Sequence, residues 1–177
     1  MVPAGDRREA ILECLAGYVL NHGLDAANLR AMARACGTSD RMLLYYFPDK
    51  ASLLAAVFER IAGQLTVMMD AAAPPQPLPP EALRATLVPL LLDQAVWPYM
   101  RVWLAMASRA AHGDPLCRAV GEQLGRGFFA WAKQHVEAPD EAARDREASR
   151  IFALIEGLVL LKALGLDDVV EQVGTAE

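Results

Sequence analysis

Apolar residues recur every three to four positions along most of the chain, which is the period of an α-helix. Near the start, for example, Leu12, Leu15 and Val19 fall on one face of a helix. Strand signals are weak, because Ala and Leu dominate the apolar positions and no Asn-Gly hairpin turn occurs. The pattern therefore predicts an all-α protein of about eight or nine helices.

Helix breakers set the predicted helix ends. Gly23 and Gly37 can end helices in the left-handed conformation, and Pro48 cannot continue the helix before it. The stretch AAAPPQPLPP has five prolines in its last seven residues, which predicts a stiff extended connector within the helical body. The predicted helices cover residues 6–21, 29–35, 40–46, 50–69, 80–94, 98–112, 115–136 and 140–164, with room for a short stub at 167–172.

Residues 29–47 have the pattern of a helix-turn-helix. Two short helices are joined by CGTS, in which Gly37 tolerates the positive φ that the turn requires. Helices of this length are not stable alone in water, so shared apolar side chains must hold them together. We expect that core to consist of Leu29, Met32, Ala33, Leu43 and Phe47.

The second short helix is a candidate for DNA recognition, because in this motif its first residues meet base edges in the major groove. Arg41 is a long forked donor that suits O6 and N7 of guanine. Lys50 opposes the dipole of the next helix, which a bound phosphate would explain, and Asn28 can meet a phosphate in the same way. The candidate DNA-binding residues are Asn28, Arg30, Thr38, Ser39, Asp40, Arg41, Met42, Tyr45, Tyr46 and Lys50.

The stretch LRAMARACGTSDRMLLYYFPDKASLLAAVF resembles the DNA-binding head of TetR-family transcriptional regulators. The match covers about residues 8–60. The chain departs from the family pattern at Arg41, where Gly is usual, and at Leu44, where Tyr is usual; Tyr45 is placed to replace the lost phosphate contact. The resemblance implies a DNA-binding domain at residues 1–50 and a ligand-binding and dimerisation domain at residues 51–177.

The resemblance also implies a homodimer, because family members typically pair their last two long helices into a four-helix bundle. Apolar residues wrap more than one stripe of the helix at 140–164, which favours burial against both the core and a partner. Two glycines four apart permit close helix approach, although a loosely packed helix with incidental glycines fits equally well. The candidate interface residues are Gly121, Gly125, Phe152, Ile155, Leu158, Val159 and Leu161.

Wide, adaptable apolar side chains, including all three tryptophans, gather between the fourth and seventh predicted helices. They favour a site for a small apolar or aromatic effector, although an ordinary core rich in aromatics has the same composition. Arg101 and Arg109 could bind an acid group there, but we expect both to be solvated. The candidate ligand-binding residues are Met68, Trp97, Tyr99, Met100, Trp103, Met106, Phe128 and Trp131.

The net charge of −5 comes entirely from the body, because residues 1–60 carry seven basic and seven acidic side chains. A neutral head implies few phosphate contacts; with about four to six per dimer, the salt slope would be about −4 to −5. Cys14, Cys36 and Cys117 are widely spaced and form no CxxC pattern, so we expect buried, reduced thiols in a cytoplasmic protein, with a metal or disulfide role as the alternative. Neither a membrane span nor a signal peptide is predicted.

Three classes of function follow, in descending order. The first is a DNA-binding transcriptional regulator, a repressor that binds a palindromic operator as a homodimer and releases it on binding its effector. The second is a helical interaction adaptor or ligand-binding protein that has lost specific DNA binding, favoured by the neutral head and Leu44. An enzyme comes last, because no catalytic or metal-ligand motif is found, and no cofactor is expected.

Overall fold

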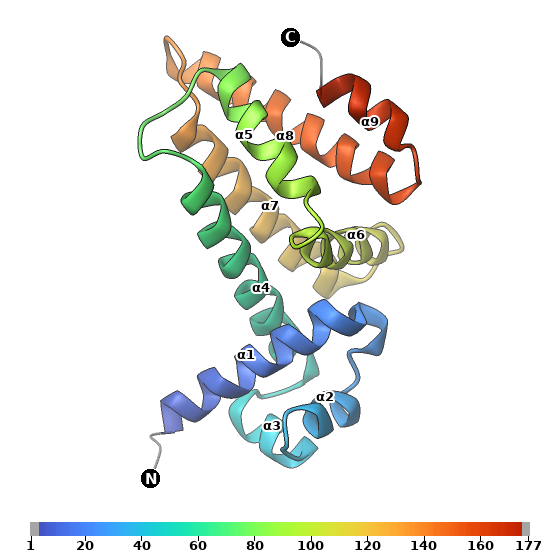
Figure 1. Cartoon of the computed structure of the whole chain (residues 1–177). Helices are drawn as coiled ribbons and strands as arrows, with labels where there is room; N and C mark the ends of the chain where they lie inside the picture. Colours follow the sequence, from blue (N-terminus) through green and yellow to red (C-terminus); the bar gives the residue numbers. More distant parts are fainter. Residues whose placement is uncertain (1–3, 175–177) are drawn as a thin grey trace. The chain divides into compact units, whose positions relative to one another are not determined.

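The computed structural model describes residues 4–174, and that part of the chain is helical, as predicted (Figure 1). Within it, the one β-type pairing is an isolated bridge. The helices are α1 (Ala4–His22), α2 (Leu29–Ala35), α3 (Asp40–Tyr46), α4 (Lys50–Ala72), α5 (Pro80–Leu92), α6 (Trp97–Ala111), α7 (Pro115–His135), α8 (Glu141–Ala163) and α9 (Asp167–Gly174), with a 3-10 helix at Leu24–Ala26.

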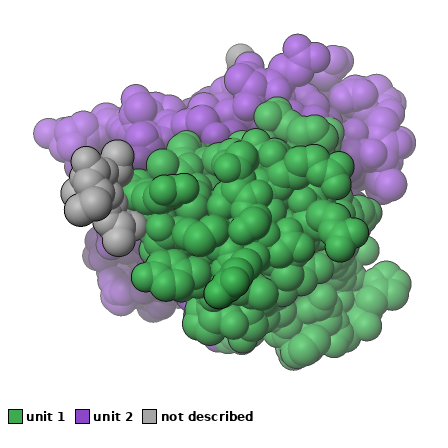
Figure 2. Space-filling model, turned by 90° about the horizontal axis from the view of Figure 1, so that it is seen from below, with its two compact units in different colours: residues 1–64, 101–122 green, residues 65–100, 123–177 purple. Residues whose placement is uncertain are grey.

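The chain divides into two compact units (Figure 2). Unit 1 comprises residues 1–64 and 101–122, and unit 2 comprises residues 65–100 and 123–177. Unit 1 therefore takes up the second part of α6 and the beginning of α7 in addition to the helix-turn-helix. The functional boundary at residue 50 stays a prediction.

Side-chain caps begin the short helices at the predicted residues. The Asn28 side chain accepts a hydrogen bond from the Ala31 N–H at 2.9 Å, and Ser39 Oγ accepts one from the Met42 N–H at 3.3 Å. Gly37 has a φ of 60°, which is the left-handed geometry expected of the turn between α2 and α3. The predicted ends of both short helices are confirmed, whereas the 3-10 helix before α2 was missed.

In the core of unit 1, α2 contacts both α1 and α3, and Figure 1 shows the two short helices together beneath α1. Leu15 and Met32 are fully buried, as is Leu43, and Phe47 is 2% exposed. Each such side chain stabilises the fold by about 1.5–3 kcal/mol relative to exposure, which is what short helices need. Leu29, expected in this core, is only half-buried.

In unit 2, α5 and α9 both contact α8 (Figure 1). The proline-rich connector is also secured there, because the Leu78 N–H donates to the His135 carbonyl oxygen at 2.8 Å. The Glu137 N–H donates to the Leu78 carbonyl oxygen at 2.7 Å, which completes the isolated bridge. The core of this unit includes Leu83, Leu87, Leu91, Ile151, Leu158 and Val159.

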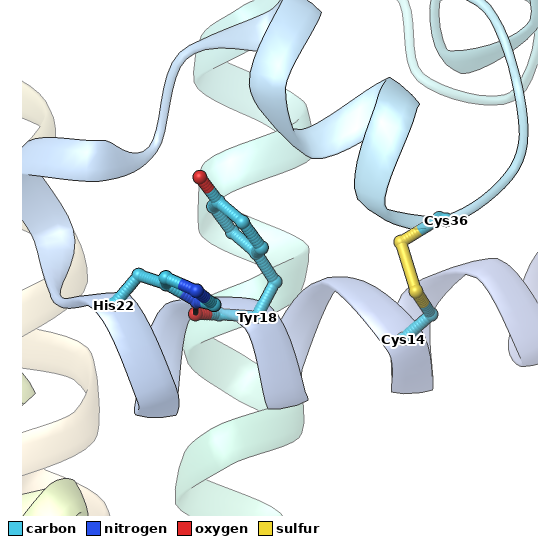
Figure 3. Close-up of a disulfide and its surroundings, with 4 residues drawn as sticks. All are labelled: Cys14, Tyr18, His22 and Cys36. Atoms are coloured by element: carbon cyan, nitrogen blue, oxygen red, sulfur yellow. Dashed lines mark hydrogen bonds between the residues drawn. A yellow bond between two sulfur atoms is a disulfide. The ribbon is translucent and has the colours of Figure 1, made fainter.

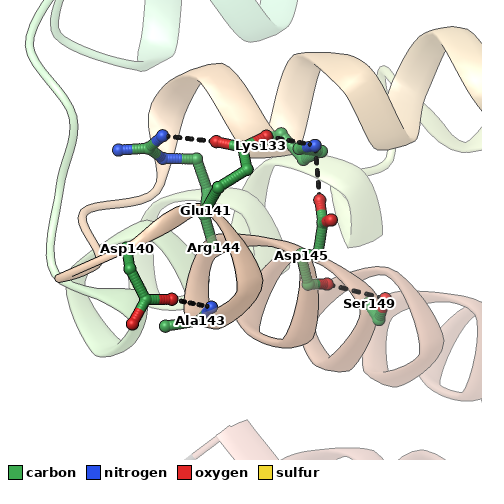
Figure 4. A network of polar contacts seen from close by, with 7 residues as sticks. All are labelled: Lys133, Asp140, Glu141, Ala143, Arg144, Asp145 and Ser149. Carbon is green, nitrogen blue, oxygen red and sulfur yellow. Dashed lines mark hydrogen bonds and ion pairs between the residues drawn. The ribbon is translucent and has the colours of Figure 1, made fainter.

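A polar network joins the end of α7 to the first turns of α8 (Figure 4). Lys133 Nζ donates to Glu141 at 2.7 Å and also contacts the Asp145 carboxylate. The hydrogen bonds that Lys133 donates to Asp145 and Glu141 raise the pKa of Lys133, and the one that Glu141 accepts from Lys133 lowers the pKa of Glu141. Asp140 caps α8 by accepting from the Ala143 N–H at 2.7 Å.

The expectation of three reduced cysteines is wrong for two of them. Cys14 on α1 and Cys36 at the C-terminal end of α2 form a disulfide, with their Cα atoms 5.8 Å apart (Figure 3). The pair is separated by 22 residues and has no motif spacing; only the packing of α2 on α1 brings the two together. Cys117 is a free, buried thiol, as expected.

Among the described residues, α4 is the one helix long and apolar enough to cross a membrane, with a mean hydropathy of 1.3 in its most apolar window. Helices in the core of a soluble protein meet the same criterion. Leu53, Val57 and Phe58 of α4 are buried in unit 1, so part of its apolar surface packs within the protein.

Candidate nucleic-acid interface

The exposed side of α3 is the centre of the candidate interface. Leu43 and Phe47 face the core, which leaves Arg41 exposed on the other side of the helix. Leu44 is 44% exposed and Tyr45 is 74% exposed, although both are large and apolar in part. A seven-residue helix that presents its large side chains to solvent is placed to contact another molecule rather than to fill a core.

The predicted DNA-binding residues fall into two groups in the structure. Asn28, Arg30, Ser39, Arg41, Tyr45 and Lys50 are exposed, and Thr38, Asp40, Met42 and Tyr46 are half-buried. The Asn28 and Ser39 side chains already cap helices, so they are less available to DNA than the long side chains. We call the exposed long side chains Arg30, Arg41, Leu44, Tyr45 and Lys50 the recognition residues.

Ion pairs distribute the charge of the head unevenly. Arg60 of α4 pairs with Glu9 and with Glu13 of α1, the latter at 3.8 Å. Arg109 of α6 pairs with Asp25 at 2.6 Å. Within the described part of the chain, in contrast, no ion pair is formed by Arg30, Arg34, Arg41 or Lys50.

The net charge of residues 1–60 is zero, but the positive charge within them is unevenly placed. Three of the seven acids, Glu9, Glu13 and Asp25, pair with arginines of α4 and α6. From the start of α2 to the first residue of α4 the four cations Arg30, Arg34, Arg41 and Lys50 stand against two acids, Asp40 and Asp49, which leaves a local excess of positive charge for a phosphate backbone. This arrangement removes the charge-based reason for expecting that the head has lost DNA binding.

The beginning of α4 carries an acidic cap next to the predicted phosphate contact. Asp49 Oδ1 accepts a hydrogen bond from the Ser52 N–H at 2.7 Å, and this bond lowers the pKa of the Asp49 carboxyl. Lys50 is exposed in the first turn, beside this cap. Because Asp49 already occupies one N–H of the helix end, Lys50 would meet a phosphate mainly through its own ammonium group.

Two arginines of α6 make polar contacts within unit 1, although Arg101 stays exposed, as expected, and the Arg109 side chain is 38% exposed. Arg101 donates from Nη2 to the Leu20 carbonyl oxygen at 3.2 Å, and Arg109 donates to Asp25 at 2.6 Å. Leu20 lies near the end of α1, and Asp25 lies in the 3-10 helix that leads to the Asn28 cap. These contacts hold, within unit 1, the segment from which α2 begins.

The predicted ligand-binding residues are divided between the two compact units. Trp103 and Met106 belong to unit 1, and the other six, Met68, Trp97, Tyr99, Met100, Phe128 and Trp131, belong to unit 2. Met100, Met106 and Trp131 are buried, and the rest are half-buried.

Both tryptophans of unit 2 contact a polar or charged side chain. The sequence pattern indicated neither contact. Trp131 Nε1 donates to Asp70 at 2.6 Å, and Lys162 Nζ lies 5.4 Å from the centre of the Trp97 ring. Neither Asp70 nor Lys162 belongs to a recognisable motif, so only the packed structure identifies them.

The predicted dimer-interface residues also differ in exposure. Leu158 is 2% and Val159 is 1% exposed in the single chain, so both already belong to its core. Phe152, Ile155 and Leu161 are half-buried, and a Cβ built on Gly121 would meet no atom within 4 Å.

The large apolar side chains that do face solvent in unit 2 lie mainly further along the chain, and the sequence pattern missed them. Five of the eight exposed large apolar side chains of the described chain fall between residues 160 and 173. We call them the C-terminal apolar residues: Leu160, Leu164, Leu166, Val169 and Val173.

A helix-turn-helix whose second helix exposes Arg41, Leu44 and Tyr45, followed by a helical body, defines a DNA-binding regulator. The comparisons agree with this class. Residues 19–57 match the family model described as bacterial regulatory proteins, tetR family. The chain is 30% identical over 162 residues to the HTH-type transcriptional regulator BetI of Paraburkholderia phytofirmans, covering 89% of this chain and 82% of that protein.

Solved structures show the same fold. The TetR-family regulator from Cytophaga hutchinsonii superposes with a TM-score of 0.73 at 17% identity, covering 98% of this chain and 94% of that one. A transcriptional regulator from Saccharomonospora viridis in complex with choline has a TM-score of 0.69 at 20% identity, covering 96% and 94%. The chain belongs to the TetR family of transcriptional regulators. It is a DNA-binding regulator and not an enzyme, which confirms the sequence-based prediction of its function class.

Proposed function

We propose that the protein is a ligand-responsive repressor that binds a near-palindromic operator as a homodimer and releases it on binding a small effector. The observation that carries the DNA-binding part is the exposed face of α3, where Arg41, Leu44 and Tyr45 face solvent while Leu43 is fully buried. Arg41 contacts base edges and Lys50 contacts the backbone, each from both protomers, so that the two recognition helices occupy successive major grooves.

The homodimer is supported by the C-terminal apolar residues. Val170 of α9 is 9% exposed and faces the chain, whereas Val169 and Val173, four apart, share an outward face. Leu160 and Leu164 are also four apart and are 50% and 66% exposed. A second copy that pairs its α8 and α9 with these residues would remove them from water, with Phe152, Ile155 and Leu161 contributing at the edge.

The effector we propose is small and apolar or aromatic, bound among the aromatic residues of unit 2 beginning with Trp97 and Tyr99. The choline complex of the Saccharomonospora viridis regulator makes a quaternary ammonium compound a useful second probe. Aromatic faces attract such cations, and the Trp97 ring already lies beside the Lys162 ammonium. In the proposed mechanism, effector and DNA oppose each other because each favours a different state of the dimer, and the protein acts in the cytoplasm.

The experiment that tests this function is selection of bound sequences from random duplexes with the purified protein. We expect an enriched near-palindrome with half-sites about 10 bp apart, and affinity that falls with salt. Failure to enrich any sequence, together with binding that is insensitive to salt, would contradict specific DNA binding. Titration of the selected duplex complex with choline and with aromatic acids and amines, followed by tryptophan fluorescence and by DNA release, then tests the effector class.

A further inference from the structure

The disulfide between Cys14 and Cys36 lies at the point where the DNA-binding head turns toward its recognition helix. Cys36 is the C-cap of α2 and directly precedes Gly37, and Ser39 begins α3 two residues later. Cys14 lies in the middle of α1, and both cysteines are half-buried (Figure 3). The bond therefore ties the turn between α2 and α3 to α1, the helix that α2 contacts, while α3 contacts α2.

A disulfide in this place has an unusual chemical setting. Proteins that work on chromosomal DNA are in contact with cellular thiols, and disulfides in such proteins are typically transient, catalytic or redox-sensing. The apolar core of the head includes Leu15, Met32, Leu43 and Phe47, all of them buried, so α2 and α3 keep their packing without the bond. The bond can thus open and close in a head that stays folded.

We infer that Cys14 and Cys36 form a reversible thiol–disulfide switch that sets the DNA affinity of the head, with small-molecule disulfides as oxidant and thiols as reductant. The inference goes beyond the proposed effector response, because it involves no ligand in unit 2. It rests on the DNA-binding function of the head.

The oxidation step is balanced by one small disulfide, RSSR. The thiolate of one cysteine attacks a sulfur of RSSR, forms a mixed disulfide and releases RS⁻. The thiolate of the other cysteine then attacks the cysteine sulfur of the mixed disulfide, which closes the Cys14–Cys36 bond and releases the second RS⁻. The two protein thiols lose two electrons and two protons, and RSSR becomes two RSH.

The closed bond corresponds to the binding-competent head. In the disulfide form, α3 is capped by Ser39, Gly37 has the turn geometry, and Arg41 is exposed on the far side of the helix from Leu43. Opening the bond removes only the covalent link between the turn and α1, so α2 and α3 stay packed while α3 samples a wider range of orientations, which lowers the fraction of heads that fit the groove. Neither cysteine belongs to α3, so the effect acts through positioning and not through contact with DNA.

Cys117 provides an internal control. It is 2% exposed, and burial raises the pKa of its thiol, so the reactive thiolate is disfavoured. Its Asp114 neighbour acts in the same direction. We expect Cys117 to stay reduced under conditions that oxidise the other two.

The test uses the full-length wild-type protein and the variants Cys14→Ser, Cys36→Ser and Cys117→Ser in glutathione buffers from fully reduced to fully oxidised. Thiols are alkylated and counted by mass spectrometry, and DNA affinity is measured by fluorescence anisotropy with the selected operator and with a random duplex at low salt. Wild type and Cys117→Ser should lose two alkylatable thiols on oxidation and bind the operator at least about fivefold more tightly when oxidised. Cys14→Ser and Cys36→Ser should show one affinity in all buffers.

Hydrogen exchange and melting provide a second readout that does not depend on DNA. The amides of α2 and α3 should exchange more slowly in the oxidised wild type, and its melting temperature should be higher by roughly 10 °C. If a serine variant fails to fold, the wild type and Cys117→Ser alone decide the outcome.

Three results would overturn the switch. They are equal operator affinities of the two redox forms, failure of the bond to form in fully oxidised buffer, and a redox response that persists in both serine variants. If neither the oxidised nor the reduced protein bound any duplex, both the switch and the DNA-binding function would be overturned. The thiol count would still show whether the Cys14–Cys36 bond forms, so this result is distinguishable from a failure of the redox chemistry.

Discussion

The recognition residues of the head and the C-terminal apolar residues of unit 2 are both exposed, but they are held in different ways. The head around Arg41 is fixed by capping hydrogen bonds, ion pairs between helices and a disulfide. Leu164 and its neighbours lie where α8 ends and the short α9 begins; α9 contacts α8 and buries Val170, and Leu164 stays 66% exposed.

This difference matches the two partners proposed above, which are DNA at the head and a second copy of the chain at the C-terminal apolar residues. Base recognition requires donors that are placed before DNA arrives, because a misplaced guanidinium loses its paired hydrogen bonds. An apolar interface gains stability mainly from the area removed from water and depends less on the position of any single atom. The molecule thus places its disulfide in the head and leaves apolar surface at the C-terminal end.

The largest expected effect is on stability, and it should differ between buried and exposed apolar residues of unit 2. Leu158→Ala removes a side chain that is 2% exposed, so it should lower the free energy of unfolding by about 2–5 kcal/mol in urea denaturation. Leu164→Ala, at 66% exposure, should change the stability of the monomer by less than about 0.5 kcal/mol. Equal losses at low protein concentration would show that Leu164 is not a free surface residue.

On the head, Arg41→Ala should weaken operator binding by about 1–3 kcal/mol and relax the preference for one base pair in each half-site. Arg146→Ala, an exposed arginine on α8, provides a matched control for the loss of one positive charge. Competition between the operator and single-base variants measures the preference. Loss of affinity without any change in preference would assign Arg41 to the phosphate backbone.

At the C-terminal end, Leu164→Asp should weaken self-association about tenfold or more, because it places a charge in the proposed apolar interface. Sedimentation at several protein concentrations gives the dissociation constant, and Leu44→Asp, which replaces an equally large exposed side chain on α3, serves as the control. A protein that is monomeric at micromolar concentration before any substitution would exclude the homodimer altogether.

A smaller change is expected for Lys50→Ala. It should weaken binding to all duplexes to a similar extent and reduce the slope of log affinity against log salt by about 0.9 for each phosphate that the lysine no longer neutralises. The measurement is the affinity for the operator and for a random duplex at four or five salt concentrations. An unchanged slope would show that Asp49, which caps the same helix, keeps phosphates away from Lys50.

The smallest effect concerns the polar network of unit 2. The hydrogen bonds that Glu141 accepts lower its pKa in the folded protein below the ordinary value of 4.5. They therefore stabilise the fold above pH 4.5, and this stabilisation is lost as the pH falls through the pKa of the folded state. Glu141→Gln should therefore flatten part of the loss of stability below about pH 4.5, as measured by the melting temperature. The capping residue Asp140 is left intact in this variant, and an unchanged pH profile would contradict the role of Glu141.

The helix-turn-helix could be predicted almost completely from the sequence. Asn28, Ser39 and Gly37 act through local hydrogen bonds and backbone geometry, which depend on near neighbours in the chain, and the ends of α2 and α3 followed from them. The identity of Leu43 and Phe47 as core residues followed in the same way from helical spacing. Once Leu43 and Phe47 were assigned to the core, the other side of α3 could be predicted to face solvent.

Only the tertiary structure decided which distant residues meet. No spacing rule joins Cys14 to Cys36, Arg109 to Asp25, or Trp131 to Asp70, because each contact arises from how helices pack and not from either segment alone. The tertiary structure also decided that Leu158 and Val159 are core while Leu160 and Leu164 face solvent, since a helix that is apolar on several sides does not reveal which side its neighbours cover. The sequence by itself determined the helices, their caps and the DNA-binding class, and the packing determined the cross-links and the surfaces left open to partners.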